Sequence, residues 1–254
     1  DIAFALGVVT LLGNRVPISL KVTLVAIAII DDLMAIIIIA AFYTSDLSIN
    51  YLILAFISTS ILFILNNRKI NKLSLYIIVG ILLWVFVLKS GIHASIAGVL
   101  LAQFIPINSK DSSSPSLLYK LEHSIEPWVN FIILPIFAFA NAGVSFSGMK
   151  LNLLWDPVTL GIILGLFFGK QIGVMLFTYL GTILKICKLP SDISWSQYYG
   201  LSLVTGIGFT MSLFIGSLAF IEPEYQTSVR LGVLIASLLA GIFGYLTLRF
   251  TTKS

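Results

Sequence analysis

The sequence predicts an all-α polytopic membrane protein, and three observations support this fold class. First, the 254 residues are 58% hydrophobic and only 10% charged, whereas a soluble domain carries about a quarter charged residues. Second, the mean hydropathy is +1.06. Third, apolar runs recur along the whole chain at lengths that match the hydrocarbon core of a bilayer. We therefore expect about nine membrane helices, counting one half-length segment.

Polar residues separate the helix candidates. A half-length apolar segment, 1–12, precedes candidates at 17–43, 50–66, 73–88, 91–106, 121–143, 158–184, 198–220 and 226–250, and 107–120 is the one long polar loop. We divide the chain into 1–43, 44–143 and 144–254. Because residue 1 is Asp and the first apolar run is too short to span, we expect the chain to begin inside a helix and to be N-terminally truncated.

The lysines and arginines predict the orientation. If the loops alternate across the membrane, eleven of these residues fall on one side and three on the other. The positive-inside rule then places the C-terminus in the cytoplasm. Fifteen basic against eleven acidic residues is a small excess, which is better explained by loop charge that orients the helices than by a nucleic-acid-binding surface, so we expect no nucleic-acid partner. The single cysteine, Cys187, excludes an internal disulfide.

A short internal repeat indicates a transporter architecture. The stretch IAFAL at 2–6 resembles IGFTM at 207–211, and each is followed by a proline-containing loop and a long apolar helix. By the charge count the two copies cross the membrane in opposite directions. Inverted repeats with interrupted helices are typical of secondary transporters. We expect 1–43 and 144–254 to carry the two repeats and 44–143 to supply interface helices.

Two adjacent acids, Asp31 and Asp32, stand in the middle of an apolar run. A charge at the bilayer centre costs roughly 2.5–3.5 kcal/mol. Neighbours on a helix point about 100° apart, so the pair can flank one site or face two partners. The functional interpretation is an ion or proton site, and the alternative is a polar contact that holds two helices together.

Lys170 is the matching cation within another apolar run. Gly161, Gly165, Gly169 and Gly173 recur every four residues around it, a pattern that lets another helix approach closely. A buried Asp–Lys pair would lower the insertion cost of both partners. The alternative is a lysine whose amine reaches the membrane surface.

The stretch LVTGIGFTMS at 203–212 places Gly206, Gly208 and Thr210 near mid-membrane. Glycine and threonine there favour local unwinding, which is tolerated where the backbone lines a cavity. Its carbonyls could then bind a cation; the alternative is a close small-residue helix contact. His93, Glu122, His123 and Glu126 lie at helix ends, where they could sense pH or simply belong to the membrane interface.

These segments closely resemble the NhaA-type Na⁺/H⁺ antiporters of bacteria. The matching stretches are DIAFALG (1–7), AIIDDLxAIIIIA (28–40), LKSGIHASIAGV (88–99), LEHSIEPWVNFIILPIFAFANAG (121–143), GKQIG (169–173) and GIGFTMSLFI (206–215). The resemblance implies a twelve-helix inverted-repeat fold in the bacterial inner membrane, with the first three helices and half of the fourth absent here. It implies no cofactor and no enzymatic activity, and it leaves a homodimer open.

The resemblance also implies roles for the residues. Asp32 would be the principal ligand of Na⁺ or Li⁺, and Asp31 would exchange between cation, proton and a salt bridge to Lys170. Asp1 would balance the dipoles of the broken helices. Glu122 and His123 would belong to a pH-responsive cluster, with His93 as a further candidate. Glu126 stands where we expect histidine, which implies a different pH set point.

We therefore expect a secondary active antiporter in which Na⁺ or Li⁺ and protons compete for Asp31 and Asp32. A first alternative is a retinal protein with a Schiff base on Lys170 and an aspartate counter-ion. A second is a truncated remnant that inserts but does not transport, and we expect the 254 residues alone not to support growth in high Na⁺ or Li⁺. Membrane lipid, the two cations and protons are the expected partners.

Overall fold

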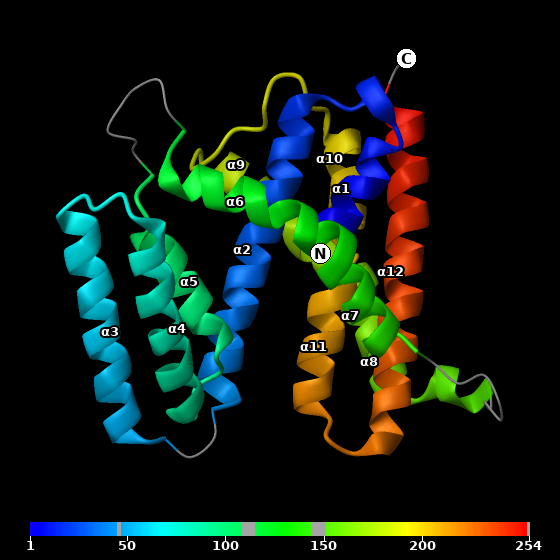
Figure 1. Cartoon of the computed structure of the whole chain (residues 1–254). Helices are drawn as coiled ribbons and strands as arrows, with labels where there is room; N and C mark the ends of the chain where they lie inside the picture. Colours follow the sequence, from blue (N-terminus) through cyan, green and yellow to red (C-terminus); the bar gives the residue numbers. More distant parts are fainter. Residues whose placement is uncertain (45–46, 108–114, 144–150, 253–254) are drawn as a thin grey trace. The chain divides into compact units, whose positions relative to one another are not determined.

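The structure is a computed structural model, and it describes residues 1–44, 47–107, 115–143 and 151–252. Within these ranges every regular element is a helix, so the predicted all-α class is confirmed (Figure 1). The helices form two compact units. Unit 1 comprises Asp1–Leu33 and Leu134–Ser254, and unit 2 comprises Met34–Ile133. Each unit is described by itself. The three-part division of the sequence stays a prediction.

Unit 2 contains the end of α2 and a group of mostly short helices. They are α3 (Ile49–Asn67), α4 (Leu73–Lys89), α5 (Ser95–Phe104), α6 (Leu117–Trp128) and the π-helical turn η2 (Val129–Ile133). Tyr76, Leu62 and Leu83 are completely buried in its core. The side-chain amide of Asn66 donates to the carbonyl of Phe104 at 2.7 Å, which ties the end of α3 to the end of α5.

Unit 1 contains the helices that build the candidate site. They are α1 (Ile2–Thr10), η1 (Gly13–Arg15), α2 (Ile18–Phe42, shared with unit 2), α7 (Leu134–Asn141), η3 (Leu151–Trp155), α8 (Pro157–Ile163), η4 (Leu164–Gly169), α9 (Lys170–Ile183), α10 (Trp195–Val204), α11 (Phe209–Ala219) and α12 (Pro223–Thr251). The long helix α12 packs along α10, α11 and α8 (Figure 1).

Close packing in unit 1 depends on small residues and buried aliphatic side chains. A methyl group added at Gly244 of α12 would lie 3.0 Å from the backbone nitrogen of Val204 in α10. Leu201, Val204 and Leu248 are completely buried where these two helices meet. Because interiors tolerate little extra volume, the absence of a side chain at position 244 permits this helix contact.

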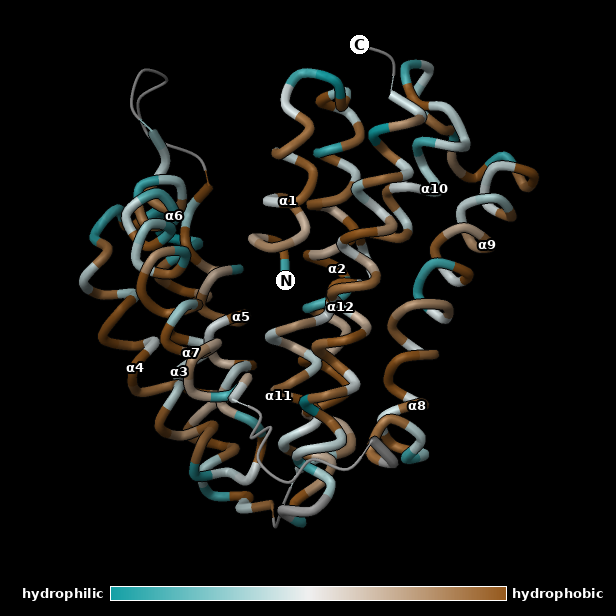
Figure 2. The backbone as a smooth tube through the Cα atoms, turned by 90° about the vertical axis from the view of Figure 1, so that its right-hand side faces the viewer, coloured by the Kyte–Doolittle hydropathy of each residue, from teal (hydrophilic) through white to brown (hydrophobic). Residues whose placement is uncertain are grey.

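The predicted helix ranges each contain a helix, but fewer of these helices are long enough to span a membrane than expected. Five spans meet the length and apolarity needed: Ile18–Phe42, Ile49–Asn67, Leu117–Asn141, Pro157–Ile183 and Tyr225–Thr251. The bent pair α10 and α11 raises this number to six. Judged by length and composition, the described part of the chain therefore has fewer membrane-spanning helices than the nine expected. Figure 2 shows that hydrophobic residues dominate the helices and hydrophilic residues gather near their ends.

Two of the predicted runs contain helices that are too short by this measure. The helices α4 and α5 are apolar but shorter than the five spans. A turn at Ser90 and Gly91, with the glycine at φ +89°, separates them. Because α5 begins only at Ser95, the apolar residues before it belong to the turn.

The glycine stripe around Lys170 does not behave as predicted. A methyl group added at Gly161, Gly165 or Gly173 would meet nothing within 4 Å, and one added at Gly169 would meet only the carbonyl of Leu164 at 3.7 Å. The expected close approach of another helix along this stripe is therefore wrong for the described residues. Glycine spacing alone does not specify a partner helix.

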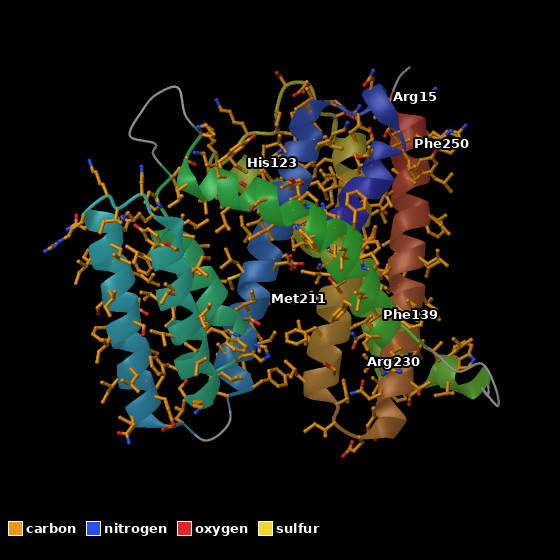
Figure 3. The ribbon with its side chains drawn as sticks, viewed as in Figure 1. Arg15, His123, Phe139, Met211, Arg230 and Phe250 are labelled. Carbon is orange, nitrogen blue, oxygen red and sulfur yellow. The ribbon has the colours of Figure 1, made fainter. Side chains whose placement is uncertain are left out.

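The ends of unit 1 carry basic side chains. Arg15 and Phe250 lie at the end of the unit where α12 finishes, and Arg230 lies toward the other end (Figure 3). The guanidinium of Arg230 donates to the carbonyl of Gly143 at 2.9 Å. Arg15 and Arg230 therefore lie toward opposite ends of the unit along the direction of α12.

Candidate functional site

The predicted unwinding near Gly206 and Gly208 is confirmed. The helix α10 ends at Val204 and α11 begins at Phe209, with a bend of 46° between them. A methyl group added at Gly206 would lie 2.7 Å from the carbonyl oxygen of Leu166, and one added at Gly208 would lie 2.9 Å from a methyl of the same leucine. Glycine is therefore required where the unwound segment contacts η4.

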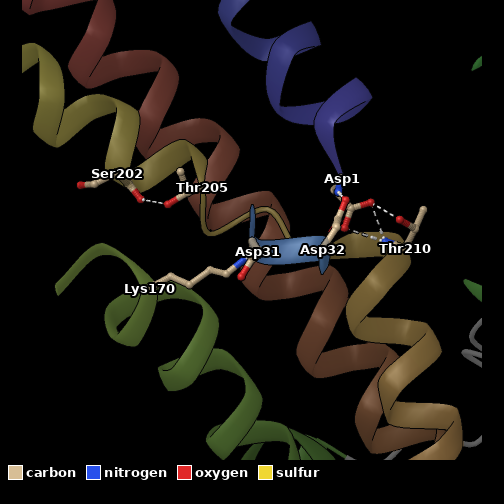
Figure 4. Close-up of polar contacts among 7 residues, drawn as sticks. All are labelled: Asp1, Asp31, Asp32, Lys170, Ser202, Thr205 and Thr210. Carbon is tan, nitrogen blue, oxygen red and sulfur yellow. Dashed lines mark hydrogen bonds and ion pairs between the residues drawn. The ribbon is translucent and has the colours of Figure 1, made fainter. Parts of the chain in front are cut away.

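Asp1 stabilises the start of α11 rather than the start of its own helix. The backbone N–H of Thr210 donates to both carboxylate oxygens of Asp1, at 2.8 and 2.9 Å, and the Thr210 hydroxyl also donates to Oδ1 (Figure 4). The Asp1 carboxylate makes no capping bond within α1. A helix N-terminus has unsatisfied N–H groups and a partial positive charge, so this carboxylate lies where both are complemented.

The two copies of the short repeat contact each other at this point. Phe4 of α1 and Phe209 of α11 occupy equivalent positions in IAFAL and IGFTM, and their rings pack edge to face with centroids 5.0 Å apart. Asp1 precedes α1 and contacts the first turn of α11. The N-terminal ends of two short helices therefore meet at one carboxylate.

Asp31 and Lys170 form the ion pair predicted from the sequence. The Lys170 ammonium lies 2.5 Å from Oδ2 of Asp31, joining α2 to the first residue of α9 (Figure 4). The side chains of Lys170 and Asp31 are 27% and 48% exposed within the chain. The pair is therefore formed as predicted, but the predicted burial is wrong, because neither side chain is buried within the described residues.

Asp32 lies next to this pair but points to a different neighbour. Its Oδ2 is 3.7 Å from the backbone nitrogen of Asp1, and its side chain is 35% exposed. No lysine, arginine or histidine side chain of the described residues lies within 4 Å of the Asp32 carboxylate. The roughly 100° between adjacent side chains thus gives the two acids different partners, one of the arrangements foreseen.

A cavity of about 230 Å³ connects the charged groups with the unwound segment. Asp1, Asp31, Lys170, Thr205 and Ile207 are among its lining residues. A water molecule occupies about 30 Å³ in the liquid, so the space admits several waters or a partly hydrated cation. Carboxylate, hydroxyl and carbonyl oxygens are the ligands that hard cations prefer.

The residues predicted for a pH response belong to unit 2. His93 Nδ1 lies 2.9 Å from the Ser95 hydroxyl at the start of α5. On α6, Nδ1 of His123 lies 3.8 Å from Oε2 of Glu126, and its ring stacks on Tyr119. Glu122 and His123 are both exposed. Their part in a pH response stays a prediction.

Two residues near the site were not selected from the sequence. Thr205 lines the cavity and donates its hydroxyl to the carbonyl of Ser202 at 2.7 Å. Gln171 is 5% exposed and follows Lys170 directly. A buried amide beside an intramembrane lysine is a signal that the sequence contains, since polar groups in an apolar run need partners.

Comparison with known proteins identifies the family. Residues 1–248 match the family described as Na⁺/H⁺ antiporter 1. The chain belongs to this family. The Na⁺/H⁺ antiporter NhaA of Pelagibacter ubique is 56% identical over 254 residues, covering 100% of this chain and 65% of that protein. The corresponding proteins of Nitrobacter hamburgensis and Rhodospirillum rubrum are each 53% identical, covering 99% and 100% of this chain and 62% and 66% of their own lengths.

The chain thus spans less than two thirds of the length of these relatives. Membership in the Na⁺/H⁺ antiporter 1 family confirms the resemblance drawn from the motifs. The family is one of Na⁺/H⁺ antiporters and not of enzymes or retinal proteins.

Proposed function

We propose that the protein is a secondary active antiporter that exchanges Na⁺ or Li⁺ for protons at Asp31 and Asp32. The observation that carries this proposal is the Asp31–Lys170 pair, with 2.5 Å between Oδ2 and Nζ, beside the break between α10 and α11. Family membership supports the same reaction, since the relatives named above are Na⁺/H⁺ antiporters.

Competition for the same oxygens couples the two ions. Na⁺ or Li⁺ binds when the carboxylates are ionised, and protons displace the cation by neutralising those oxygens. Because the site does not hold both at full occupancy, alternating exposure to the two sides of the membrane exchanges one ion for the other without ATP. No cofactor takes part in this exchange.

Each residue of the site has a part in this mechanism. Asp32 is the principal cation ligand, since no basic side chain of the described residues lies within 4 Å of it. Asp31 alternates between Lys170 and the transported cation or proton. Asp1 offsets the positive ends of α1 and α11. The unwound backbone at Gly206 and Gly208, with Thr210, lines the pathway.

The orientation and surroundings of the chain are part of the proposal. The eleven-to-three distribution of basic loop residues supports a cytoplasmic C-terminus. The bacterial sources of the relatives support a place in the bacterial inner membrane. Glu122, His123 and His93 adjust the response to pH, and a second copy of the chain in a homodimer is the expected protein partner.

Proton release from vesicles tests the role of Asp32. Vesicles that hold the full-length protein and a trapped pH dye are diluted into LiCl, and Asp32→Asn is expected to abolish Li⁺-dependent proton release. The control is Asp192→Asn, because Asp192 is an exposed acid that accepts a hydrogen bond from Ser19 outside the site. Unchanged exchange in Asp32→Asn would remove this residue from the site.

The remnant alternative predicts a different pattern. A chain that inserts but does not transport would release no protons in any variant and would not rescue an antiporter-deficient host in high Na⁺ or Li⁺. Binding of Li⁺ to the purified chain, measured by calorimetry, separates an intact site without transport from a site that does not form. Loss of that binding in Asp32→Asn but not in Asp192→Asn is the expected result.

A further inference from the structure

A wide helical turn lies immediately before Lys170. Residues Leu164–Gly169 form the π-helical segment η4, and the backbone N–H of Lys170 donates to the carbonyl of Gly165, five residues back. A single π turn acts as a one-residue insertion in an α-helix and is often found at functional sites. It rotates the residues that follow by about 100° relative to an uninterrupted α-helix. The direction of the Lys170 side chain therefore depends on this turn.

The return from π to α spacing leaves one carbonyl without a helical N–H partner. Two carbonyls of the turn have neighbours outside the helical hydrogen-bond ladder. The carbonyl of Leu166 faces Gly206, as the 2.7 Å contact of an added methyl group there indicates. The carbonyl of Phe167 accepts the side-chain amide of Gln171 at 2.7 Å.

Gln171 is buried and contacts the wide turn through its side chain. Its side chain is 5% exposed, and its amide donates to the carbonyl of Phe167, four residues earlier. It is next to Lys170 in sequence, so its side chain points about 100° away from the lysine. A buried amide needs a partner, and the wide turn supplies one.

We propose that Gln171 is a positioning residue for Lys170. Its amide donates to the Phe167 carbonyl within the wide turn, and this hydrogen bond restrains the turn on which the direction of Lys170 depends. The wide turn in turn directs the Lys170 ammonium to Asp31. The inference deepens the proposed antiport, on which it rests, because it names a residue that sets how strongly Lys170 competes with the cation for Asp31.

The geometry predicts the direction of the effect. If the amide is lost, the turn relaxes and the 2.5 Å contact between Lys170 and Asp31 lengthens. Li⁺ then no longer has to displace an ammonium group from Asp31, so its dissociation constant falls. Turnover also falls, because the ammonium no longer neutralises Asp31 when the cation leaves. A role in folding alone would lower stability without this opposite movement of affinity and turnover.

A double-mutant cycle tests the inference. Gln171→Met keeps the length of the side chain and removes the donor. In the protein with Lys170 it is expected to lower the Li⁺ dissociation constant about fivefold, which corresponds to one hydrogen bond of ordinary strength. In the Lys170→Met background the same change is expected to have less than about a twofold effect. Gln171→His retains a donor and is expected to restore the parent value.

Gln197→Met is the matched control. Gln197 also donates to a main-chain carbonyl, that of Thr251 at 3.5 Å, but it belongs to the capping box of α10. This variant is expected to leave the Li⁺ dissociation constant unchanged. An equal effect of Gln171→Met in both backgrounds, or no effect in a folded Gln171→Met protein, would overturn the inference. Gln171→Leu repeats the test if the methionine variant does not fold.

Failure of the proposed function is distinguishable from failure of this inference. If the parent chain binds no Li⁺, the antiport proposal fails, and melting temperatures then decide the role of Gln171. If Gln171→Met lowers the melting temperature less in the Lys170→Met background than in the protein with Lys170, the result supports a coupling between Gln171 and Lys170. Equal shifts in both backgrounds refute it.

Discussion

The contact between Asp1 and Thr210 makes a quantitative prediction, because Thr210→Val removes one hydroxyl and preserves the shape of the side chain. The Asp1 side chain is 2% exposed, and it accepts from both the hydroxyl and the backbone N–H of Thr210. The valine variant keeps the backbone donor. What is lost is one hydrogen bond to a buried carboxylate, which is worth about 1.5–3 kcal/mol.

Reversible unfolding in mixed detergent measures this loss as a decrease in the free energy of unfolding. Thr10→Val is the control, since the Thr10 hydroxyl donates to the carbonyl of Leu6 at 2.7 Å on an exposed face of α1. The control is expected to stay within about 0.5 kcal/mol of the parent. If Thr210→Val is equally mild, Asp1 does not hold α11 in place, and the account of the helix junction is wrong.

Two further predictions concern the same junction. Asp31→Asn leaves the Lys170 ammonium unpaired, so it is expected to destabilise the chain more than the double variant Asp31→Asn with Lys170→Met. Unfolding free energies of the single and double variants should give a coupling energy between about 0.5 and 3 kcal/mol. If the effects of the two single variants simply add, the ion pair does not contribute to stability. Gly206→Ala places a methyl 2.7 Å from the Leu166 carbonyl and is expected to cost about 1–3 kcal/mol. Gly161→Ala, which meets nothing within 4 Å, should be stabilising by up to about 1 kcal/mol, and a loss there would show that the position is crowded.

The positions of the helices and of the main ion pair could be predicted because the membrane imposes simple rules. Backbone groups in lipid must be paired within a helix, so apolar runs bounded by polar residues correspond to helices such as α2 and α12. A charge in such a run needs a partner. Lys170 lies mid-run in the sequence, and Asp31 is one of the two acids that could neutralise it. Hydropathy and charge are therefore sufficient to predict the helices and the Asp31–Lys170 pair.

The remaining features depend on information that hydropathy does not contain. The π turn before Lys170 changes the spacing of hydrogen bonds but not the composition of the run. The contact from Asp1 to Thr210 joins residues 209 positions apart. The stripe from Gly161 to Gly173 has the spacing of a helix interface, yet a methyl group added at three of its glycines would meet none of the described residues within 4 Å. Each of these features is decided by tertiary packing.

Charge balance at the junction explains why Asp32 is the acid to which a mobile cation is assigned. Each helix N-terminus carries roughly half a positive charge, so the ends of α1 and α11 together offset about one carboxylate, that of Asp1. The Lys170 ammonium offsets Asp31. Asp32 then remains as the carboxylate that no lysine, arginine or histidine side chain of the described residues neutralises. Because a carboxylate without a basic side-chain partner within a membrane helix is costly, binding a cation or a proton at Asp32 would be favourable, and competition of this kind is what the proposed exchange requires.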